Sequence, residues 1–380
     1  MPDNQALTDI QEEVIQITSR DYSGLADLIS RDRPAVGYFC PYVPEELLWA
    51  AGAQPFRLID TPVKISLAQA HLPAYCCHPV KSYLQNLLQG DLDFLQGIVF
   101  SHSCDAYKGL AEIWSRQNRS AFQLNLMIPT RLESDRSRNF LKAELSRFVD
   151  ELGRRLQPVT AEGLRAALTL LNDIREHQAR LYRLRRQHPR LLTGDFFARV
   201  IQSGFWLDRE RYSRLLQKLV AALEQTVPQR DDRVPVYLTG NMVHDPYWFS
   251  AIEDSGACIV WDDLCSGART FRLKTTDTPD PLEALTDRYF SGVFCPTKFY
   301  GPQARQEILF REIQDSGARG LIFLLYKYCE PHFFDYPDLK QFLEERGIPT
   351  LLLEVEDPAQ SRGQMKLRIQ AFMEMLEMPE

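Results

Sequence analysis

Short apolar runs alternate with amphipathic segments along the first part of the chain. Ala35–Phe39 and Phe56–Ile59 are compact, mostly apolar runs typical of buried strands. Between them, Pro44–Ala51 has helical spacing, begins with proline and is followed by Gly52, which are the usual start and stop signals of a helix. The order strand, helix, strand predicts a parallel sheet.

The alternation continues and then gives way to helices alone. One or two leading helices are expected within Ala6–Ser30, a helix over His78–Leu88, and strands over Phe94–Phe100 and Phe122–Met127. From Arg131 to about Glu224, charged segments with apolar stripes follow one another and predict a helical connector. The helices expected there span 140–156, 161–187, 196–205 and 213–223.

The last third returns to the strand–helix pattern. Strands are expected over 235–238, 258–261, 320–326 and 349–353, and helices over 247–255, 282–289, 304–316, 339–346 and 361–376. In each half one strand ends near a cysteine followed by an acid, Cys104-Asp105 and Cys329-Glu330. We therefore predict an α/β fold with two doubly wound, parallel-sheet domains of the Rossmann-like or flavodoxin-like kind, joined by a helical segment. The expected parts are N-terminal helices in 1–33, a first α/β domain in 34–130, a helical connector in 131–230 and a second α/β domain in 231–380.

Charge and composition exclude two classes of partner. The 380 residues carry a formal net charge of -7, whereas a general nucleic-acid binder needs a cationic surface. No apolar run approaches the ~20 residues that a membrane helix needs. Met1–Glu13 is polar and acidic, without the apolar core of a signal peptide. We expect a soluble, cytoplasmic protein that binds neither nucleic acid nor membrane.

Three of the eight cysteines occupy positions suited to a shared site. Cys104 and Cys329 follow expected strands, and ligands of parallel sheets gather at the carboxyl ends of strands. Cys77 begins an expected helix, where free N–H groups favour a thiolate. The sequence has no C-x-x-C pair, so a metal site would be assembled from distant segments. Thiolates without histidines at metal spacing favour an iron–sulfur cluster over a catalytic zinc.

The other five cysteines allow more than one interpretation. Cys258 and Cys76 are interpreted as small buried apolar residues, because that is the usual role of a lone cysteine. Cys40, Cys265 and Cys295 are assigned to loops after predicted strands, and two of them precede a proline, as some iron–sulfur ligands do.

Several segments resemble a known family. Cys77–Ser82, Gly97–Asp105 and Lys327–Pro337 are similar to the three cysteine segments of the 2-hydroxyacyl-CoA dehydratase D-component family, which includes 2-hydroxyglutaryl-CoA dehydratase and benzoyl-CoA reductase subunits. The resemblance runs from about Pro34 to the C-terminus. Further matching segments are Val36–Leu47, Ala50–Ala53, Trp261–Arg269 and Gly347–Glu354.

The resemblance implies a cofactor, a substrate and partners. It implies a 4Fe-4S cluster on Cys77, Cys104 and Cys329, an acyl-CoA substrate, and a homo- or heterodimer with a homologous subunit. It also implies a separate ATP-hydrolysing iron–sulfur activator, and the chain itself lacks a G-x-x-x-x-G-K-[ST] phosphate loop. The implied reaction adds one electron to the thioester carbonyl, giving a ketyl radical that loses a 2-hydroxyl group in a dehydratase; a reductase places the electron in a ring or double bond.

Two other functions stay open. Cys40, Cys265 and Cys295 resemble the extra cysteines of the family's double-cubane branch, whose members reduce small molecules. A non-catalytic electron-relay or scaffold subunit is the third interpretation. Catalytic acid–base residues are not assigned, although polar residues lie near the motifs and the acids among them are expected at helix caps or on the surface. These residues are Glu45, Glu46, His102, Asp105, His244 and His332; His102 and His332 are candidates for hydrogen bonds to cluster sulfurs.

Overall fold

The computed structural model describes residues 4–117, 120–229, 231–356 and 362–378. The first half of the chain forms a four-stranded sheet in the order β2-β1-β3-β4, and all neighbouring strands are parallel. Side chains alternate between its faces, so that Ile98 and Phe100 pack on one side and Val99 on the other. The strands are β1 (Ala35–Tyr38), β2 (Gln54–Arg57), β3 (Gly97–Ser101) and β4 (Phe122–Leu126).

The second half repeats this topology. Its four strands are parallel and lie in the order β6-β5-β7-β8, so each strand occupies the same position as its counterpart in the first sheet. The predicted α/β fold with two parallel sheets is therefore confirmed. The strands are β5 (Val234–Gly240), β6 (Ala257–Asp263), β7 (Gly320–Tyr326) and β8 (Thr350–Val355).

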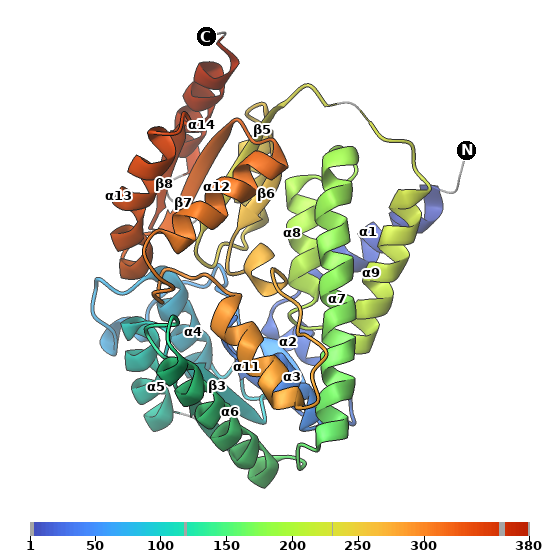
Figure 1. Ribbon diagram of the computed structural model, residues 1–380, viewed down its shortest axis with the longest axis vertical. Coiled ribbons are helices and arrows are strands. Elements are labelled where there is room, and N and C mark those ends of the chain that lie inside the picture. The colour runs from blue at the N-terminus through green and yellow to red at the C-terminus, as the bar shows by residue number, and fades with distance from the viewer. Residues whose placement is uncertain (1–3, 118–119, 230, 357–361, 379–380) are drawn as a thin grey trace.

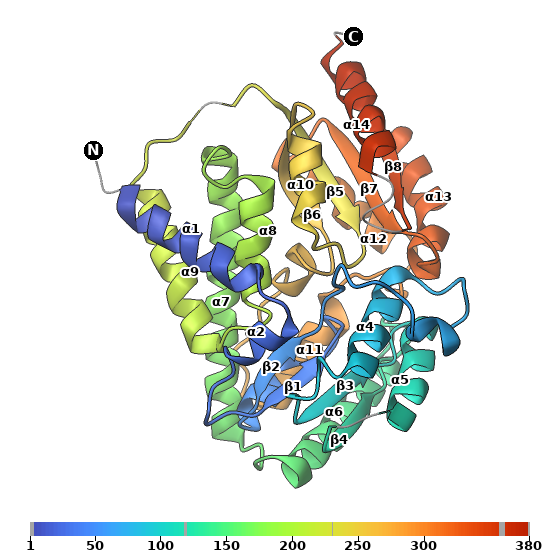
Figure 2. The same cartoon turned by 180° about the vertical axis from the view of Figure 1, so that it is seen from behind.

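Helices cover both faces of each sheet, as a doubly wound fold requires. In the first half, α4 and α5 pack on one face while α3 and α6 pack on the other. Two leading helices, α1 and α2, precede the first strand, in agreement with the prediction (Figure 2). The elements are α1 (Asn4–Thr18), α2 (Tyr22–Ala26), α3 (Glu45–Ala50), the 3-10 turn η1 (Ala68–Ala70), α4 (His78–Gln89), α5 (Asp105–Gln117) and α6 (Asp135–Arg155).

The connecting helices stand beside both sheets. Figure 1 shows the long helix α7 running along the two halves, with α8 and α9 next to it. In the second half, α10 and α14 cover one face of the sheet and α12 and α13 the other. The elements are α7 (Ala161–Gln187), α8 (Gly194–Ser203), α9 (Arg209–Glu224), α10 (Pro246–Glu253), the 3-10 turn η2 (Ala268–Thr270), α11 (Pro281–Ser291), α12 (Ala304–Ser316), α13 (Glu330–Glu344) and α14 (Arg362–Glu377).

Three helices differ from the sequence-based prediction in their presence, their length or the sheet against which they pack. Helix α5, directly after Cys104, was not predicted. Helix α13 was expected only from Leu339, but it begins at Glu330 and contains Pro337 in its interior. Helix α11 returns to the first sheet, where Leu285 and Tyr289 join the core beneath α3 and α6. The four-part division of the chain stays a prediction.

Candidate functional site: cysteines between two sheets

The carboxyl ends of the two sheets meet. Arg57, the last residue of β2, donates from its guanidinium to the sulfur of Met242, two residues past β5, over 3.2 Å. The backbone N–H of Asp60 likewise donates to Nε2 of His244 over 3.0 Å. Because loops leave parallel strands at this edge, the loops of both halves face each other here.

All three predicted cysteines lie at this junction. Cys77 is the N-cap residue of α4 and Cys329 that of α13, while Cys104 directly precedes α5. Each thiol is therefore positioned by the start of a helix, where the macrodipole favours negative charge. Cys77 and Cys104 come from the first half of the chain and Cys329 from the second, so the site depends on contact between the halves.

The three sulfurs are electrostatic neighbours. Burial raises the pKa of the Cys77 thiol well above its usual value, and negative charge on Cys329 and Cys104 raises it further. Burial and Cys329 likewise raise the pKa of Cys104. The pKa of Cys329 is raised to about 11, chiefly by burial. The structure thus brings together the three cysteines that the sequence singled out, and without a bound cation their protonated forms are favoured.

Three further cysteines lie beside this group. Negative charge on Cys40 and Cys295 contributes to the raised pKa of Cys104, after burial. The thiols of Cys265 and Cys295 share a hydrogen bond, which lowers the pKa of Cys295 and raises that of Cys265. The assignment of Cys295 to a loop after a strand was wrong, because it lies between α11 and α12. Six cysteines therefore line one junction.

The donor set fits a cluster better than a single ion. In the described part of the chain, no three His, Cys, Asp or Glu side chains are arranged to hold one metal ion. A cubane is different, because each of its ligands binds a separate iron and the sulfurs need not converge on one point. Three partly buried thiols from separate segments disfavour each other's charge until a cation is bound, which is the chemistry that such a cluster requires.

A chain of hydrogen bonds connects Cys265, one of the three further cysteines, to Cys329, one of the three predicted ligands. Arg269 is held by Asp263 through two contacts of 2.9 and 2.7 Å. Its NH1 group lies 3.1 Å from the sulfur of Cys265 and 3.2 Å from Nε2 of His332. Because arginine only donates, Nε2 must accept, and the proton of the neutral imidazole is on Nδ1. That Nδ1 lies 3.3 Å from the sulfur of Cys329, to which it donates.

The environment keeps His332 neutral. Burial, followed by the positive charges of Arg269 and Arg305, lowers the pKa of His332 well below its usual value. His332 contacts the sulfur of Cys329, while its hydrogen bond to a cluster sulfur stays a prediction. Arg269 was not singled out by the sequence. The only signal for Arg269 was its place at the end of the matching segment Trp261–Arg269.

Two cysteines follow residues with unusual backbone conformations. Tyr328 has φ of 66° and precedes Cys329, and Phe294 has φ of 48° and precedes Cys295. Positive φ is costly for aromatic residues and is found where the surroundings over-determine the chain, often at functional sites. Neither position could be recognised from the sequence, because glycine is the usual signal for this conformation.

A second polar group joins the halves beside Cys77. Nδ1 of His78 lies 3.1 Å from one carboxylate oxygen of Asp60, and His244 contacts the Asp60 backbone as described above. Burial opposes ionisation of Asp60, but the neighbouring imidazoles of His244 and His78 outweigh it and hold the pKa of the carboxyl well below its usual range. The His78 ring stacks on Tyr326 at the end of β7, with 6.3 Å between ring centroids.

The remaining candidates lie elsewhere or have other partners. Glu46 was expected at a cap or on the surface; it lies in the first turn of α3, fully buried and paired with Arg175, so the surface alternative was wrong. Asp105 is exposed and pairs with Lys108. Nε2 of His102 is buried without a hydrogen-bond partner among the described residues, so its contact with a sulfur stays a prediction.

Cys258 lies apart from the other cysteines, and different charged groups surround it. It lies inside β6, and the charges that affect its thiol are those of Arg185, Glu253 and Arg233 rather than of another cysteine. Cys76 precedes Cys77 and is buried, and burial raises its pKa. These surroundings support the interpretation of Cys258 as a core residue, so its substitution can serve as a control for substitutions at the cysteine site.

The fold and the site define a class: an α/β chain of two doubly wound halves with a cysteine site between their strand ends. Residues 40–376 match the family described as "2-hydroxyglutaryl-CoA dehydratase, D-component". The chain belongs to this family, and the resemblance inferred from its motifs is confirmed. Family membership also confirms the expected enzyme class, a subunit of the dehydratase (lyase) or benzoyl-CoA reductase (oxidoreductase) type.

Curated relatives match over nearly their whole length. The (R)-phenyllactyl-CoA dehydratase beta subunit of Clostridium sporogenes is 25% identical over 343 residues, covering 90% of this chain and 91% of the relative. The (R)-2-hydroxyglutaryl-CoA dehydratase subunit beta of Acidaminococcus fermentans is 24% identical, with 98% and 100% covered. A benzoyl-CoA reductase subunit of Thauera aromatica is 24% identical, with 88% of each protein covered.

None of the helices in the described ranges combines the length and the apolar character that crossing a membrane requires.

Proposed function

We propose that this chain is the iron–sulfur subunit of an enzyme that dehydrates or reduces an acyl-CoA thioester. In this proposal Cys77, Cys104 and Cys329 hold a 4Fe-4S cluster. The observation that carries it is the meeting of three partly buried thiols, each at a helix start, at the junction of the two sheets. When bound there, the cluster would supply single low-potential electrons to the thioester.

The chain's own residues have defined tasks in this proposal. The three thiols lose their protons to become ligands, so cluster assembly releases protons and weakens at low pH. His332 donates from Nδ1 to the sulfur of Cys329 and is oriented by Arg269. Such donors to ligand sulfurs stabilise the more negative, reduced state of a cluster.

The proposal includes two protein partners. The relatives are named as beta subunits or as one subunit of a reductase, which supports assembly with a homologous subunit. The chain has no G-x-x-x-x-G-K-[ST] phosphate loop, so energy from ATP would enter through a separate iron–sulfur activator. Acyl-CoA is the proposed substrate, and the cytoplasm is the proposed compartment.

Iron content tests the site. After anaerobic purification we expect about four irons and four acid-labile sulfides per chain. The variants C77A, C104A and C329A should each lose most of the iron, while C258A, a buried cysteine outside the site, should keep it. Full iron in all three site variants would refute the ligand assignment. Turnover of an acyl-CoA with partner subunit and activator then tests the reaction separately.

A second candidate is supported by the six-cysteine arrangement. Cys40 and Cys295 lie close enough to the first group for their charges to interact, and Cys265 shares a hydrogen bond with Cys295. Arg269 connects Cys265 to Cys329 through His332. This arrangement would suit a double-cubane cluster that reduces small molecules. About eight irons per chain, falling to about half in C40A or C295A, would favour this function over the first.

The scaffold interpretation has a direct test. A complex is prepared from the partner subunit and a C77A/C104A/C329A chain without iron. If this complex still turns over acyl-CoA at the full rate, the chain serves as a relay or scaffold and not as the catalytic iron–sulfur subunit.

A further inference from the structure

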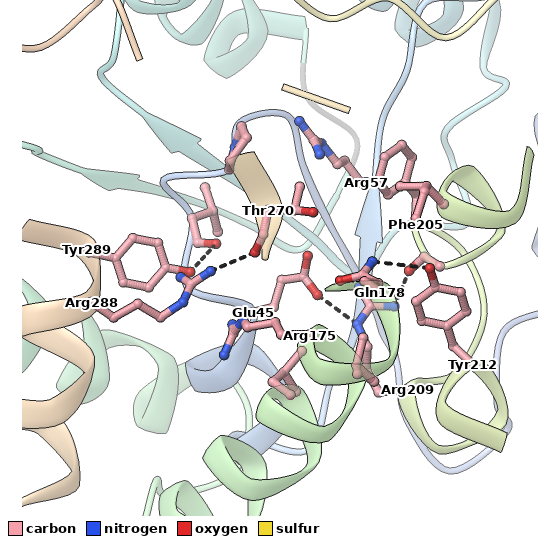
Figure 3. A pocket seen from close by; sticks show the side chains of 16 residues that line it. Glu45, Arg57, Arg175, Gln178, Phe205, Arg209, Tyr212, Thr270, Arg288 and Tyr289 are labelled. Atoms are coloured by element: carbon pink, nitrogen blue, oxygen red, sulfur yellow. Dashed lines mark hydrogen bonds and ion pairs between the residues drawn. The ribbon is translucent and has the colours of Figure 1, made fainter. Parts of the chain in front are cut away.

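A small polar cavity lined by four arginines lies behind the cysteine-bearing loops. Figure 3 shows the side chains that line it. The cavity has a volume of about 50 Å³. The guanidinium groups come from four separate elements: Arg57 from β2, Arg175 from α7, Arg209 from α9 and Arg288 from α11. These side chains are only 1 to 6% exposed. Four buried cations around one cavity require compensation, because an unpaired charge is costly in the interior.

Two carboxylates supply only half of that compensation. Glu45 accepts from Nε of Arg209 over 2.7 Å, and Figure 3 shows it between Arg209 on one side and Arg288 on the other. Glu46, just outside the cavity lining, pairs with Arg175. Two guanidinium charges are thus left over at the cavity.

Arg57 contributes to this excess positive charge. It donates from Nε to the backbone oxygen of Phe39 over 3.1 Å and from NH2 to the sulfur of Met242, a weak acceptor. Within the described ranges, no carboxylate forms an ion pair with Arg57. Its charge is therefore neutralised neither by a side chain nor by solvent.

Arg288 shares one carboxylate, Glu46, with Arg175, and one of its donors makes no hydrogen bond. Its Nε and NH2 groups donate to the backbone oxygens of Leu273 and Thr270, at 3.0 and 2.8 Å. Its NH1 is buried without a hydrogen-bond partner in the part of the chain that the structure describes, and Glu46 is 3.9 Å away, beyond hydrogen-bond distance. Burial, followed by the charge of Arg288, lowers the pKa of neighbouring Arg175, so the two cations repel each other.

We propose that this cavity binds one small inorganic anion of the size of chloride or bromide. An anion would accept from the unused NH1 of Arg288 and offset the excess positive charge around it. The cavity is far smaller than the ~300 Å³ or more of a site for an organic ligand, which excludes a coenzyme or an acyl group. The site is separate from the cysteines, and the proposal does not depend on the proposed function.

Bromide locates the anion in the intact protein. Crystals grown in sodium bromide should give an anomalous-scattering peak within contact distance of Arg288 NH1. In solution, the thermal midpoint at constant ionic strength should be higher in chloride or bromide than in gluconate, which is too large for the cavity. A cavity holding water only, with equal midpoints in all three salts, would overturn the proposal.

Two substitutions should change halide affinity in opposite directions. R288Q removes a positive charge and the unused donor, so the halide-dependent rise of the midpoint should disappear. E45Q removes the competing negative charge while keeping the side-chain shape, so the affinity should increase roughly tenfold.

The variant R138Q is the control for the possibility that R288Q acts only by weakening the packing of α11. Arg138 attaches α11 to α6 through Glu283 and Asp287 but does not line the cavity. R138Q should keep the halide effect of the natural chain. A halide effect that is unchanged in R288Q and E45Q would exclude the cavity as its source.

Discussion

At the scale of single residues, the cysteine site depends on side chains that orient other side chains. Arg269 fixes the tautomer of His332, and His332 in turn presents its Nδ1–H to Cys329. Asp263 holds Arg269 in place from the end of β6. Burial and nearby positive charge lower the pKa of His332, which favours the neutral imidazole that accepts at Nε2 from Arg269 and carries its proton on Nδ1.

His332 should tune the potential of a bound cluster. H332N keeps an N–H group near the position of Nδ1, whereas H332Q keeps one near Nε2 and loses the donor to Cys329. A hydrogen bond of about 1 kcal/mol corresponds to roughly 40 mV for one electron. We expect H332Q to lower the midpoint potential by about that amount, measured by redox titration, and H332N to stay near the natural value. Equal potentials in both variants would show that the contact has no electronic role.

A buried histidine outside the cysteine site predicts a pH dependence of stability. Burial lowers the pKa of His188 at the end of α7, so its folded-state pKa lies below the unfolded value near 6.5. Its contribution to stability is present above pH 6.5 and is lost as the pH falls toward the folded-state pKa. The free energy of unfolding should therefore decrease through this group as the pH falls below about 6.5. Denaturant titrations at several pH values should show that H188Q lacks this pH dependence of the free energy of unfolding. The same pH dependence in H188Q and in the natural chain would contradict the assignment. H71Q, at an exposed position, is the control and should keep the pH dependence.

At the scale of elements, close approach between strands determines where glycine is needed. Gly240 ends β5, and a Cβ atom there would lie 2.2 Å from the backbone oxygen of Leu324 in the neighbouring strand β7. Neither strand can move without disturbing the sheet. Gly109 in the middle of α5 is the opposite case, because a Cβ atom there meets nothing within 4 Å.

Alanine at these two glycines should therefore have opposite effects. G240A should lower the free energy of unfolding by about 2 kcal/mol, because the added methyl group clashes with backbone. G109A should raise it by about 1 kcal/mol, because alanine favours a helix interior over glycine. Denaturant titration of the two variants beside the natural chain measures both effects, and a stabilised G240A would contradict the packing described here.

At the scale of the whole molecule, two halves of the same topology face each other across the cysteine site. The contacts between the strand ends include Asp60 with His244 and Arg57 with Met242. Cys77 and Cys104 belong to one half and Cys329 to the other. A cofactor held by all three cysteines would therefore link the halves covalently, through metal–sulfur bonds.

Removal of iron should loosen the junction between the halves. Ligand binding to the folded state raises stability, so the chain stripped of iron should have a lower thermal midpoint than the loaded chain. Amide hydrogen exchange should increase most in the loops at Cys77, Cys104 and Cys329, and much less in the strands of either sheet. Equal exchange in the two forms would show that no shared cofactor connects the halves.

The sequence by itself was sufficient for the repeating architecture. All eight strands were expected close to where they occur, because buried parallel strands are continuous apolar runs between helix signals. The sequence failed at α5 and at the first turns of α13. There, Gly109 and Pro337 weaken the local helix signal, and packing against the rest of the fold outweighs the local preference.

For the cysteine site too, some features could be predicted from the sequence and others only from the tertiary structure. Position after a strand or at a helix start, together with the family resemblance, was enough to select Cys77, Cys104 and Cys329. Only the tertiary structure placed Cys295 beside Cys265, connected Arg269 to His332, and gathered four arginines around one cavity. Periodicity and local motifs determine which elements form, because they act between neighbours in the sequence. Contacts between side chains from distant segments follow from how the two sheets and their loops pack together.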